Sequence, residues 1–313
     1  MKNREGSTYG TAIILVDDNL RPIIEAEIST FEALFPEVNI RAHYVPGEQA
    51  IKQMLAQDSI RMAISTRRMS KEEETHLQAR NISPKYAGIA NTGIAIVIHP
   101  DNPFKQLSME QLEGILTGEL TNWGQLQGGN QSGDIALVFD HPQSSTLKFL
   151  TDSILTDKAL TKQGIFAQQN TPEMIQYVAT NPNAIGFGGW NWISDVDEPM
   201  TDSLRKSVKL VWLGRDSTQQ LCLDESPYVG PYQSFLLQRC YPLTQTVTTV
   251  LRESNYGPAT GFVSHLDGPQ GQRVIHKGGL ATVHGIDREI RLPAKEGAQS
   301  IRETIPESAN STK

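Results

Sequence analysis

The stretch "GIAIVIHPDNPFKQLSMEQLEGILTG", residues 93–118, contains both local patterns from which this chain is built. Its first part, "GIAIVI", is a short continuous apolar run of the kind that forms a buried strand. Its last part, "SMEQLEGILTG", predicts a helix that ends at Gly118, because glycine commonly follows the last turn of a helix. A buried strand followed by a helix is the building unit of an α/β protein.

The same order of elements fills the chain before this stretch. A strand, "TAIILV", is followed by a helix whose apolar residues recur at helical spacing and which stops at Pro36. A later polar helix begins with Ser70 and Glu73 in the arrangement of a capping box. Repeated strand–helix–strand order favours a parallel sheet covered by helices, so we predict an α/β fold. The predicted elements are strands at 11–16, 38–45 and 60–66 and helices at 19–37, 48–57 and 70–80.

A second α/β unit is predicted after Gly118. Its segment 194–207 is polar and carries no predicted element, and the polar residues 294–313 are expected to form a disordered tail. The predicted elements are strands at 134–139, 184–189 and 208–213, a helix that begins near Ser144, a helix at 171–182 and a final helix at 259–279.

Composition excludes several classes of protein. The 313 residues suffice for two domains, and no apolar run approaches the roughly 18 residues that span a bilayer. The formal charge of −7 argues against nucleic acid, because no basic face could displace the counterions of a phosphate backbone. Cys222 and Cys240 lack metal-ligand spacing, and the sequence leaves open whether they form a disulfide or two buried thiols. The N-terminal residues have no apolar core, so either the protein is cytoplasmic or an export segment has been removed.

Sequence motifs of enzymes are missing. There is no GxSxG elbow, no HExxH, no Walker-type loop and no dinucleotide-binding glycine pattern. His141 lies three residues before Ser144, but we interpret it as a turn residue, because a general base needs a geometry that sequence does not reveal. We therefore expect a protein that is not an enzyme and that carries no cofactor and no metal.

Four turns lead from a predicted strand into a predicted helix, and ligands of open α/β sheets bind at such strand ends. The N-terminus of a helix offers free N–H groups and a partial positive charge, which suits an anion. Each turn also has a simpler interpretation, since Ser144–Thr146 and Ser65–Thr66 can be helix caps and Arg67–Arg68 a solvated pair. The turns are "VDDNLRP" at 16–22, "VPGEQ" at 45–49, "STRRM" at 65–69 and "DHPQSST" at 140–146.

Several segments resemble one family of binding proteins. The quoted stretch, extended through "ELTNWGQL" to residue 126, resembles the segment that enters the second domain of phosphate-binding (PstS-like) solute-binding proteins of ABC importers. "NPNAIGFGGWNWI", "YPLTQTVTTVL" and "GFVSHLDGPQGQRVIHKGGLATV" resemble later motifs of the same family, in the same order. The resemblance covers about residues 10 to 285.

The resemblance implies a type 2 periplasmic-binding-protein fold, in which two α/β lobes are joined by hinge strands and close on a ligand. Lobe I would comprise 1–93 and 239–313, and lobe II would comprise 94–238. The protein would capture an oxyanion, which is phosphate in this family, for an ABC permease, as a monomer in the periplasm or anchored at the cell exterior. The implied ligand-binding residues are Asp18, Asn19, Gly47, Ser65, Thr66, Arg67, Ser144, Ser145 and Thr146.

Four positions in two of these turns depart from the family pattern. Asp17 and Asp18 stand where the family usually presents serine or threonine, Ser145 replaces a glycine, and Asp140 falls where an arginine is expected. A desolvated carboxylate repels a phosphate dianion unless it is protonated or paired. Arg21 and Arg67 are the candidates to compensate this charge. The alternative is a two-lobe binding or sensor protein whose cleft recognises a different ligand.

Overall fold

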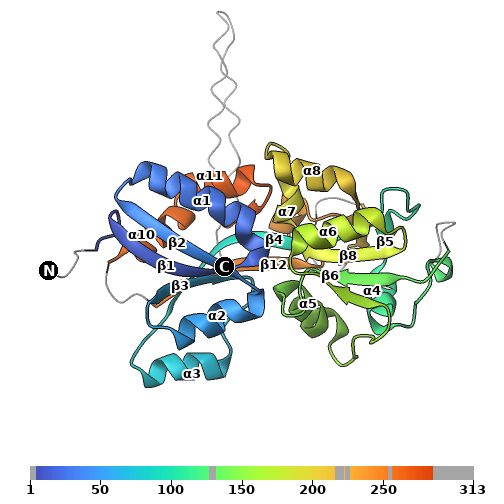
Figure 1. Cartoon of the computed structure of the whole chain (residues 1–313), viewed down its shortest axis with the longest axis horizontal. Coiled ribbons are helices and arrows are strands. Elements are labelled where there is room, and N and C mark those ends of the chain that lie inside the picture. Colours follow the sequence, from blue (N-terminus) through green and yellow to red (C-terminus); the bar gives the residue numbers. More distant parts are fainter. Residues whose placement is uncertain (1–4, 127–131, 216–221, 223–225, 253–255, 285–313) are drawn as a thin grey trace, which may run out of the picture.

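The computed structural model describes residues 5–126, 132–215, 222, 226–252 and 256–284. These residues form two α/β lobes that lie side by side, with strands β4 and β12 running between them (Figure 1). The predicted α/β class and the two-lobe architecture are confirmed. Among the described residues, no helix combines the length and the apolar character that crossing a bilayer requires.

Most strands belong to one sheet that extends through both lobes. Its order is β2-β1-β3-β12-β4-β8-β6-β7, and β9 and β13 add to β4 at its sides. β1 pairs in parallel with β2 and β3, and β6 pairs in parallel with β8 and β7, whereas β12 and β4 are antiparallel to their neighbours. The strands are β1 (Gly10–Asp17), β2 (Val38–Val45), β3 (Ile60–Ser65), β4 (Lys85–Ile98), β6 (Ala136–Phe139), β7 (Ile165–Ala167), β8 (Ala184–Gly189), β9 (Lys209–Leu210), β12 (Thr244–Leu251) and β13 (Ala281–Thr282).

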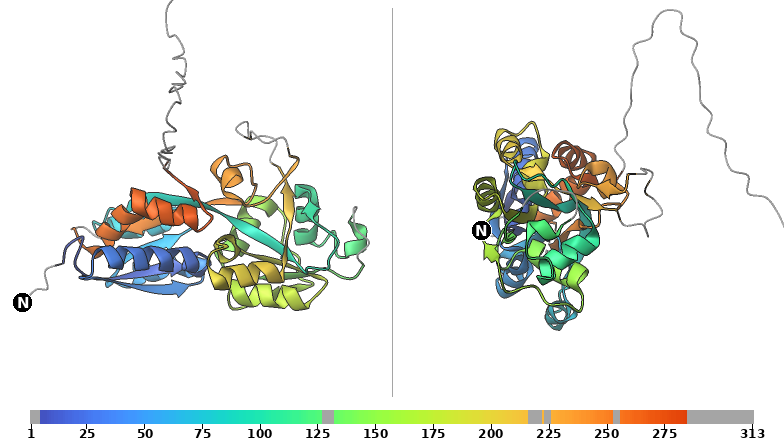
Figure 2. Two further views of the ribbon diagram at one scale, coloured as in Figure 1. Left: turned by 90° about the horizontal axis from the view of Figure 1, so that it is seen from above. Right: turned by 90° about the vertical axis from the view of Figure 1, so that its right-hand side faces the viewer.

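Strand β4 connects the lobes, as Figure 2 shows in the view from above. Its first part pairs with β12 as far as Gly93, and from Ile94 onward it pairs with β8. The partner of β4 therefore changes at the boundary predicted for the lobes, although the boundaries as such stay a prediction. A separate small sheet in the second lobe joins β11 (Tyr228–Val229), β10 (Trp212–Gly214) and β5 (Gln106–Leu107).

Helices cover both faces of the sheet in each lobe (Figure 1). In lobe I the apolar sides of α1, α10 and α11 form one core with the sheet, and α2 and α3 form another core on the opposite face. A single larger core fills lobe II. The helices of lobe I are α1 (Arg21–Leu34), α2 (Gly47–Ala56), α3 (Lys71–Ala79), α10 (Pro258–Asp267) and α11 (Pro269–Lys277). Those of lobe II are α4 (Met109–Thr117), α5 (Ser145–Phe149), α6 (Thr171–Thr180), α7 (Asn191–Ser194), α8 (Pro199–Ser207) and α9 (Gln233–Leu237).

Short helical turns complete the chain. The turn η1 (Asp18–Leu20) precedes α1, η2 (Trp123–Gln125) follows α4, and a π-helical segment, η3 (Leu150–Leu155), continues α5. The predicted capping box at Ser70 and the left-handed Gly118 after α4, with φ of 82°, are both present.

The structure corrects three predicted elements. The single helix expected at 259–279 is two helices, because Pro269 has no N–H to donate and opens a new first turn after an extended Gly268. The strand expected at 208–213 is divided between β9 and β10, which belong to different sheets. The polar segment 194–207 contains α8, whose few buried side chains gave a weak apolar pattern.

Cys222 and Cys240 form a disulfide, which decides a question that the sequence left open. Cys240 is completely buried in the core of lobe II, directly after α9. The bond ties the segment after β10 to the start of the return toward lobe I. The predicted disordered tail at 294–313 lies outside the described residues.

Candidate functional site: a cavity between the lobes

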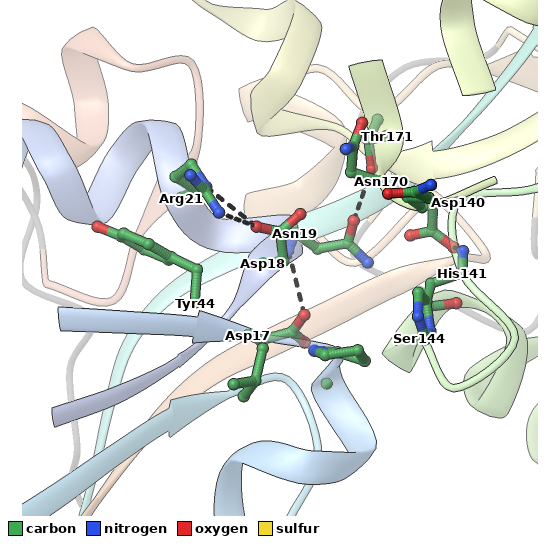
Figure 3. A pocket seen from close by; sticks show the side chains of 14 residues that line it. Asp17, Asp18, Asn19, Arg21, Tyr44, Asp140, His141, Ser144, Asn170 and Thr171 are labelled. Atoms are coloured by element: carbon green, nitrogen blue, oxygen red, sulfur yellow. Dashed lines mark hydrogen bonds and ion pairs between the residues drawn. The ribbon is translucent and has the colours of Figure 1, made fainter. Parts of the chain in front are cut away.

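A cavity of about 400 Å³ lies between the lobes, where several parallel strands end and the following helices begin (Figure 3). Its volume falls in the range of small-molecule sites in proteins. Lobe I contributes Asp17, Asp18, Asn19, Arg21, Tyr44, Val45, Pro46 and Gly47, and lobe II contributes Asp140, His141, Ser144, Gln169, Asn170 and Thr171.

Helix N-termini surround this cavity. Helix α2 begins at Gly47, and α6 begins at Thr171 with Asn170 as its N-cap. Ser144 caps the short helix α5, and its hydroxyl accepts a hydrogen bond from Leu147 N at 3.1 Å. Because the first N–H groups of a helix carry a partial positive charge, this arrangement favours negative charge in the cavity.

Gly47 permits a close approach of the two lobes. A Cβ at this position would lie 2.6 Å from Asp17 Oδ2 and 2.6 Å from Ser145 Cβ. Any side chain would therefore push these two residues away from the N-terminus of α2. The second predicted turn thus contributes backbone rather than a functional group.

Asp17 is a buried carboxyl at the end of β1, with 1% of its surface exposed. Its Oδ1 accepts a hydrogen bond from Asn19 N at 3.1 Å, whereas Oδ2 has no hydrogen-bond partner among the described residues. The Ser145 hydroxyl lies close enough to the carboxyl to oppose a rise of its pKa. Burial raises the pKa of Asp17 to about 7, and the negative charge of Asp140 contributes in the same direction. Near neutral pH Asp17 therefore exists in both protonation states.

Asp140 is the second buried carboxyl, with 2% of its surface exposed. It accepts hydrogen bonds from Thr146 Oγ1 at 3.1 Å and from His141 N at 3.0 Å. Burial raises its pKa, although the neighbouring hydroxyl and amide donors of Ser144, Asn19 and Thr146 oppose this shift. Together with Asp18, these two buried carboxyls make the cavity electrostatically unlike a site built only from donors.

Asn19 extends from lobe I into lobe II, with 7% of its surface exposed. Its side-chain Nδ2 donates to Thr146 Oγ1 at 2.9 Å and lies 3.3 Å from Ser145 Oγ. Its Oδ1 accepts a hydrogen bond from Thr171 Oγ1 at 2.8 Å, drawn in Figure 3. The hydroxyls predicted to bind a ligand therefore contact a side chain of the other lobe.

The two arginines predicted to compensate charge are already paired. Arg21 lines the cavity, but its guanidinium binds Asp18 Oδ1 at 2.7 Å and lies 4.4 Å from the centre of the Tyr44 ring. Arg67 lies outside the cavity and binds Glu73. Among the described lining residues, Arg21 is the only arginine or lysine.

The structure brings together part of the predicted site. Asp18, Asn19, Gly47 and Ser144 line the cavity, as does the charge-compensating candidate Arg21. Ser145 and Thr146 are buried behind Asn19 and are not lining residues. The third turn, which holds Ser65, Thr66 and Arg67, does not line the cavity, and the Ser65 hydroxyl accepts a hydrogen bond from Arg67 N at 3.2 Å.

Sequence reasoning missed the lining residues Tyr44, Gln169, Asn170 and Thr171. A signal for the last three was present, because "QQNTP" at 168–172 joins β7 to α6 and is a further strand-to-helix turn. His141 lines the cavity, and its Nδ1 accepts a hydrogen bond from Gln143 N, as a turn histidine would. No three histidine, cysteine, aspartate or glutamate side chains of the described residues are placed to share a metal ion.

Two α/β lobes with a cavity at their facing strand ends define a solute-binding architecture. The sequence matches the family model described as "PBP superfamily domain" over residues 2–266, and the chain belongs to this family.

Named relatives and solved structures agree with this assignment. The phosphate-binding protein PstS of Pseudomonas aeruginosa is 23% identical over 301 residues, which cover 91% of this chain and 84% of the relative. PstS of Bacillus subtilis is 24% identical over 67% of this chain and 68% of its own length. A putative phosphate ABC transporter substrate-binding protein with bound phosphate from Clostridium perfringens has a TM-score of 0.72 at 24% identity, covering 88% of this chain and all of its own. A phosphate transport receptor of Vibrio cholerae has a TM-score of 0.63 at 22% identity, covering 87% of this chain and 99% of its own. These structures support the fold, and the resemblance seen in the sequence is confirmed.

Proposed function

We propose that this protein is the solute-binding component of an ABC importer and captures phosphate between its lobes. The observation that carries this proposal is the interlobe cavity at which the N-termini of α2 and α6 meet the Ser144 turn. The names of the relatives and neighbouring structures support the same ligand and the same transport role. The proposal includes lobes that divide near residues 93 and 239, a monomer outside the cytoplasmic membrane and a membrane permease as partner.

The chemistry of the cavity favours a protonated oxyanion. A fully ionised Asp17 would repel a dianion, but hydrogen phosphate carries an O–H group that can donate to Asp17 Oδ2, which has no other partner among the described residues. A protonated Asp17 can instead donate to a phosphate oxygen. Sulfate has no proton near neutral pH and cannot satisfy the ionised carboxyl, so we propose that the site prefers phosphate to sulfate.

A second candidate ligand is a neutral or cationic molecule rich in hydrogen-bond donors. The observation that favours it is the set of three carboxyls, Asp17, Asp18 and Asp140, in a cavity where Arg21 is already paired. In this version the protein keeps the two-lobe fold but serves a different solute or acts as a sensor.

Isothermal titration distinguishes these candidates. The protein is titrated with phosphate, sulfate, molybdate and a phosphonate at pH 6 and pH 8, and in parallel with a polyol and a diamine. We expect phosphate to bind, more tightly at pH 6 because protonation of Asp17, whose pKa burial raises to about 7, removes repulsion. Binding of the diamine but of none of the oxyanions would overturn the phosphate proposal and favour the second candidate.

Absence of catalysis belongs to the same proposal. The PBP superfamily match describes a binding domain, and we expect no hydrolysis of a generic phosphoester. Hydrolysis that is lost in Ser144→Ala, a variant of the helix cap at the cavity, would contradict this expectation.

A further inference from the structure

Asn19 of lobe I contacts three separate elements of lobe II. Its side-chain amide reaches Thr146 of α5 and Thr171 of α6, at 2.9 and 2.8 Å. Its backbone carbonyl accepts a hydrogen bond from the side-chain amide of Asn191 in α7. These partners lie 127, 152 and 172 residues away along the chain and belong to the other lobe, so the contacts join the two lobes in this structure.

The hydrogen bonds that join Thr171, Asn19, Thr146 and Asp140 form a chain in which each group donates to the next. The Thr171 hydroxyl donates to Asn19 Oδ1, and Asn19 Nδ2 donates to Thr146 Oγ1. The Thr146 hydroxyl in turn donates its single proton to Asp140 Oδ2 at 3.1 Å. Because a hydroxyl has only one proton, Thr146 cannot donate to Asp140 and to an oxyanion at the same time.

Lobe II also packs closely against the backbone of this residue and of the residue before it. Gly189 at the end of β8 has no side chain, and a Cβ there would lie 2.9 Å from the Asn19 carbonyl oxygen and 3.1 Å from Asn19 Cβ. The indole N–H of Trp192 donates to the carbonyl of the preceding residue, Asp18, at 3.3 Å. Lobe II therefore surrounds both the side chain and the backbone of the Asn19 turn.

We propose that Asn19 is a positioning residue that latches the two lobes together in the absence of a ligand. It occupies hydroxyls of lobe II that an incoming anion would otherwise meet, so a ligand has to displace it or bind beside it. Only the identity of the competing ligand rests on the proposed function. The latch itself concerns the protein without any ligand.

Distance measurements between spin labels on the two lobes test the latch. Labels are attached to Gln78→Cys in α3 and Glu110→Cys in α4, both exposed positions, since the native cysteines are bonded to each other. Without ligand, we expect one short distance population in the otherwise unchanged protein. In Asn19→Ala we expect a second, longer population, because the contacts with Thr146 and Thr171 are lost.

A matched control makes a different contact between the lobes. Gln49 Nε2 donates to Gln143 Oε1 at 3.0 Å at the exposed rim, so Gln49→Ala should keep the short distance. Thr171→Val, which keeps the shape of threonine but not its hydroxyl, should show part of the longer population if Asn19→Ala does not fold. A latch is excluded if the labelled protein is already open without ligand, or if the variant that folds keeps the original distance.

Phosphate is then added to the labelled Asn19→Ala protein as a separate arm of the experiment. Return of the short distance would be expected from the proposed function. Failure to return, together with a positive result without ligand, would count against phosphate as the ligand and would leave the latch supported.

Discussion

Arg67 and Glu73 bind each other through two hydrogen bonds of 2.8 Å, from both terminal nitrogens of the guanidinium to the two carboxylate oxygens. Glu73 Oε2 also accepts a hydrogen bond from Ser70 N, so one carboxylate caps α3 and holds Arg67. Although burial opposes the shift, the hydrogen bond from Arg67 lowers the pKa of Glu73. Glu48 of α2 lies 3.4 Å from Arg67 Nε. Arg67 therefore connects α2 with α3 and is not among the residues that line the cavity between the lobes.

Replacing Arg67 by alanine should lower stability rather than ligand affinity. The bidentate pair is largely buried, and loss of hydrogen bonds to a charged group costs about 1–3 kcal/mol. Urea unfolding should show this decrease, while titration with phosphate should show an affinity within about threefold of the original. The neighbouring Arg68→Ala is the control, because Arg68 is exposed and should change neither property. A large loss of affinity in a folded Arg67→Ala protein would put Arg67 in the site after all.

The pKa of Asp17 should make the stability of the protein depend on pH. The folded protein releases this proton at about pH 7, whereas an ordinary aspartate releases it near 3.8. Between these values the folded state binds more protons than the unfolded chain, so the free energy of unfolding falls as pH rises, by at most about 1.4 kcal/mol per pH unit. Above about pH 7 this contribution is constant.

Asp17→Asn isolates the effect, because asparagine does not ionise and keeps an acceptor for Asn19 N. Urea unfolding at several pH values from 4.5 to 8 should give a shallower decline for the variant. Glu27 also has a pKa raised to about 7, mainly by burial, but it contributes equally to both proteins. Parallel curves for the variant and the original protein would show that Asp17 titrates normally.

The disulfide should stabilise lobe II. It closes a segment of 18 residues, and the chain-entropy model assigns about 3 kcal/mol to a loop of this length. Reduction with dithiothreitol should lower the free energy of unfolding by about 3 kcal/mol, which is measured as a lower midpoint of urea unfolding. Cys222→Ser, chosen because Cys222 is less buried than Cys240, should show the lower midpoint already and should not respond to reductant. An unchanged midpoint after complete reduction would contradict the expected contribution.

Patterns set by neighbouring residues were predictable from the sequence. The apolar spacing of α1, the capping box at Ser70 and the glycine after α4 depend on residues within a few positions of each other, and all three are present. The division at Gly268 and Pro269 was equally local, since proline cannot continue a helix, and the long apolar pattern around it obscured that signal.

Contacts between distant segments were not predictable in the same way. The sequence reveals that Arg67 is positive but not whether it turns toward a ligand or toward Glu73, which is decided by the packing of α3. The meeting of Asn19 with Thr171 joins residues 152 positions apart and depends on how the lobes close. Likewise Cys222 and Cys240 had no spacing that favoured a bond, and their pairing follows from the path of lobe II.

Asp140 is the residue whose replacement should change phosphate binding most clearly. Only 2% of its surface is exposed, and it lines the cavity. It also stands at the position where the family resemblance leads us to expect an arginine. Repulsion between an ionised carboxylate and a nearby bound anion weakens binding by about 4 kcal/mol at a separation of about 4 Å and an effective dielectric of about 20. Asp140→Asn removes this charge and keeps an acceptor for Thr146, so phosphate should bind about tenfold or more tightly at pH 8. Because burial raises the pKa of Asp140, the gain should become smaller as the pH is lowered. Asp152→Asn, an exposed carboxylate of the same lobe paired with Lys148, is the control for a general change in charge. If the Asp140 variant loses affinity while the control does not, the carboxylate itself contacts the ligand, and a donor-rich solute becomes the better assignment.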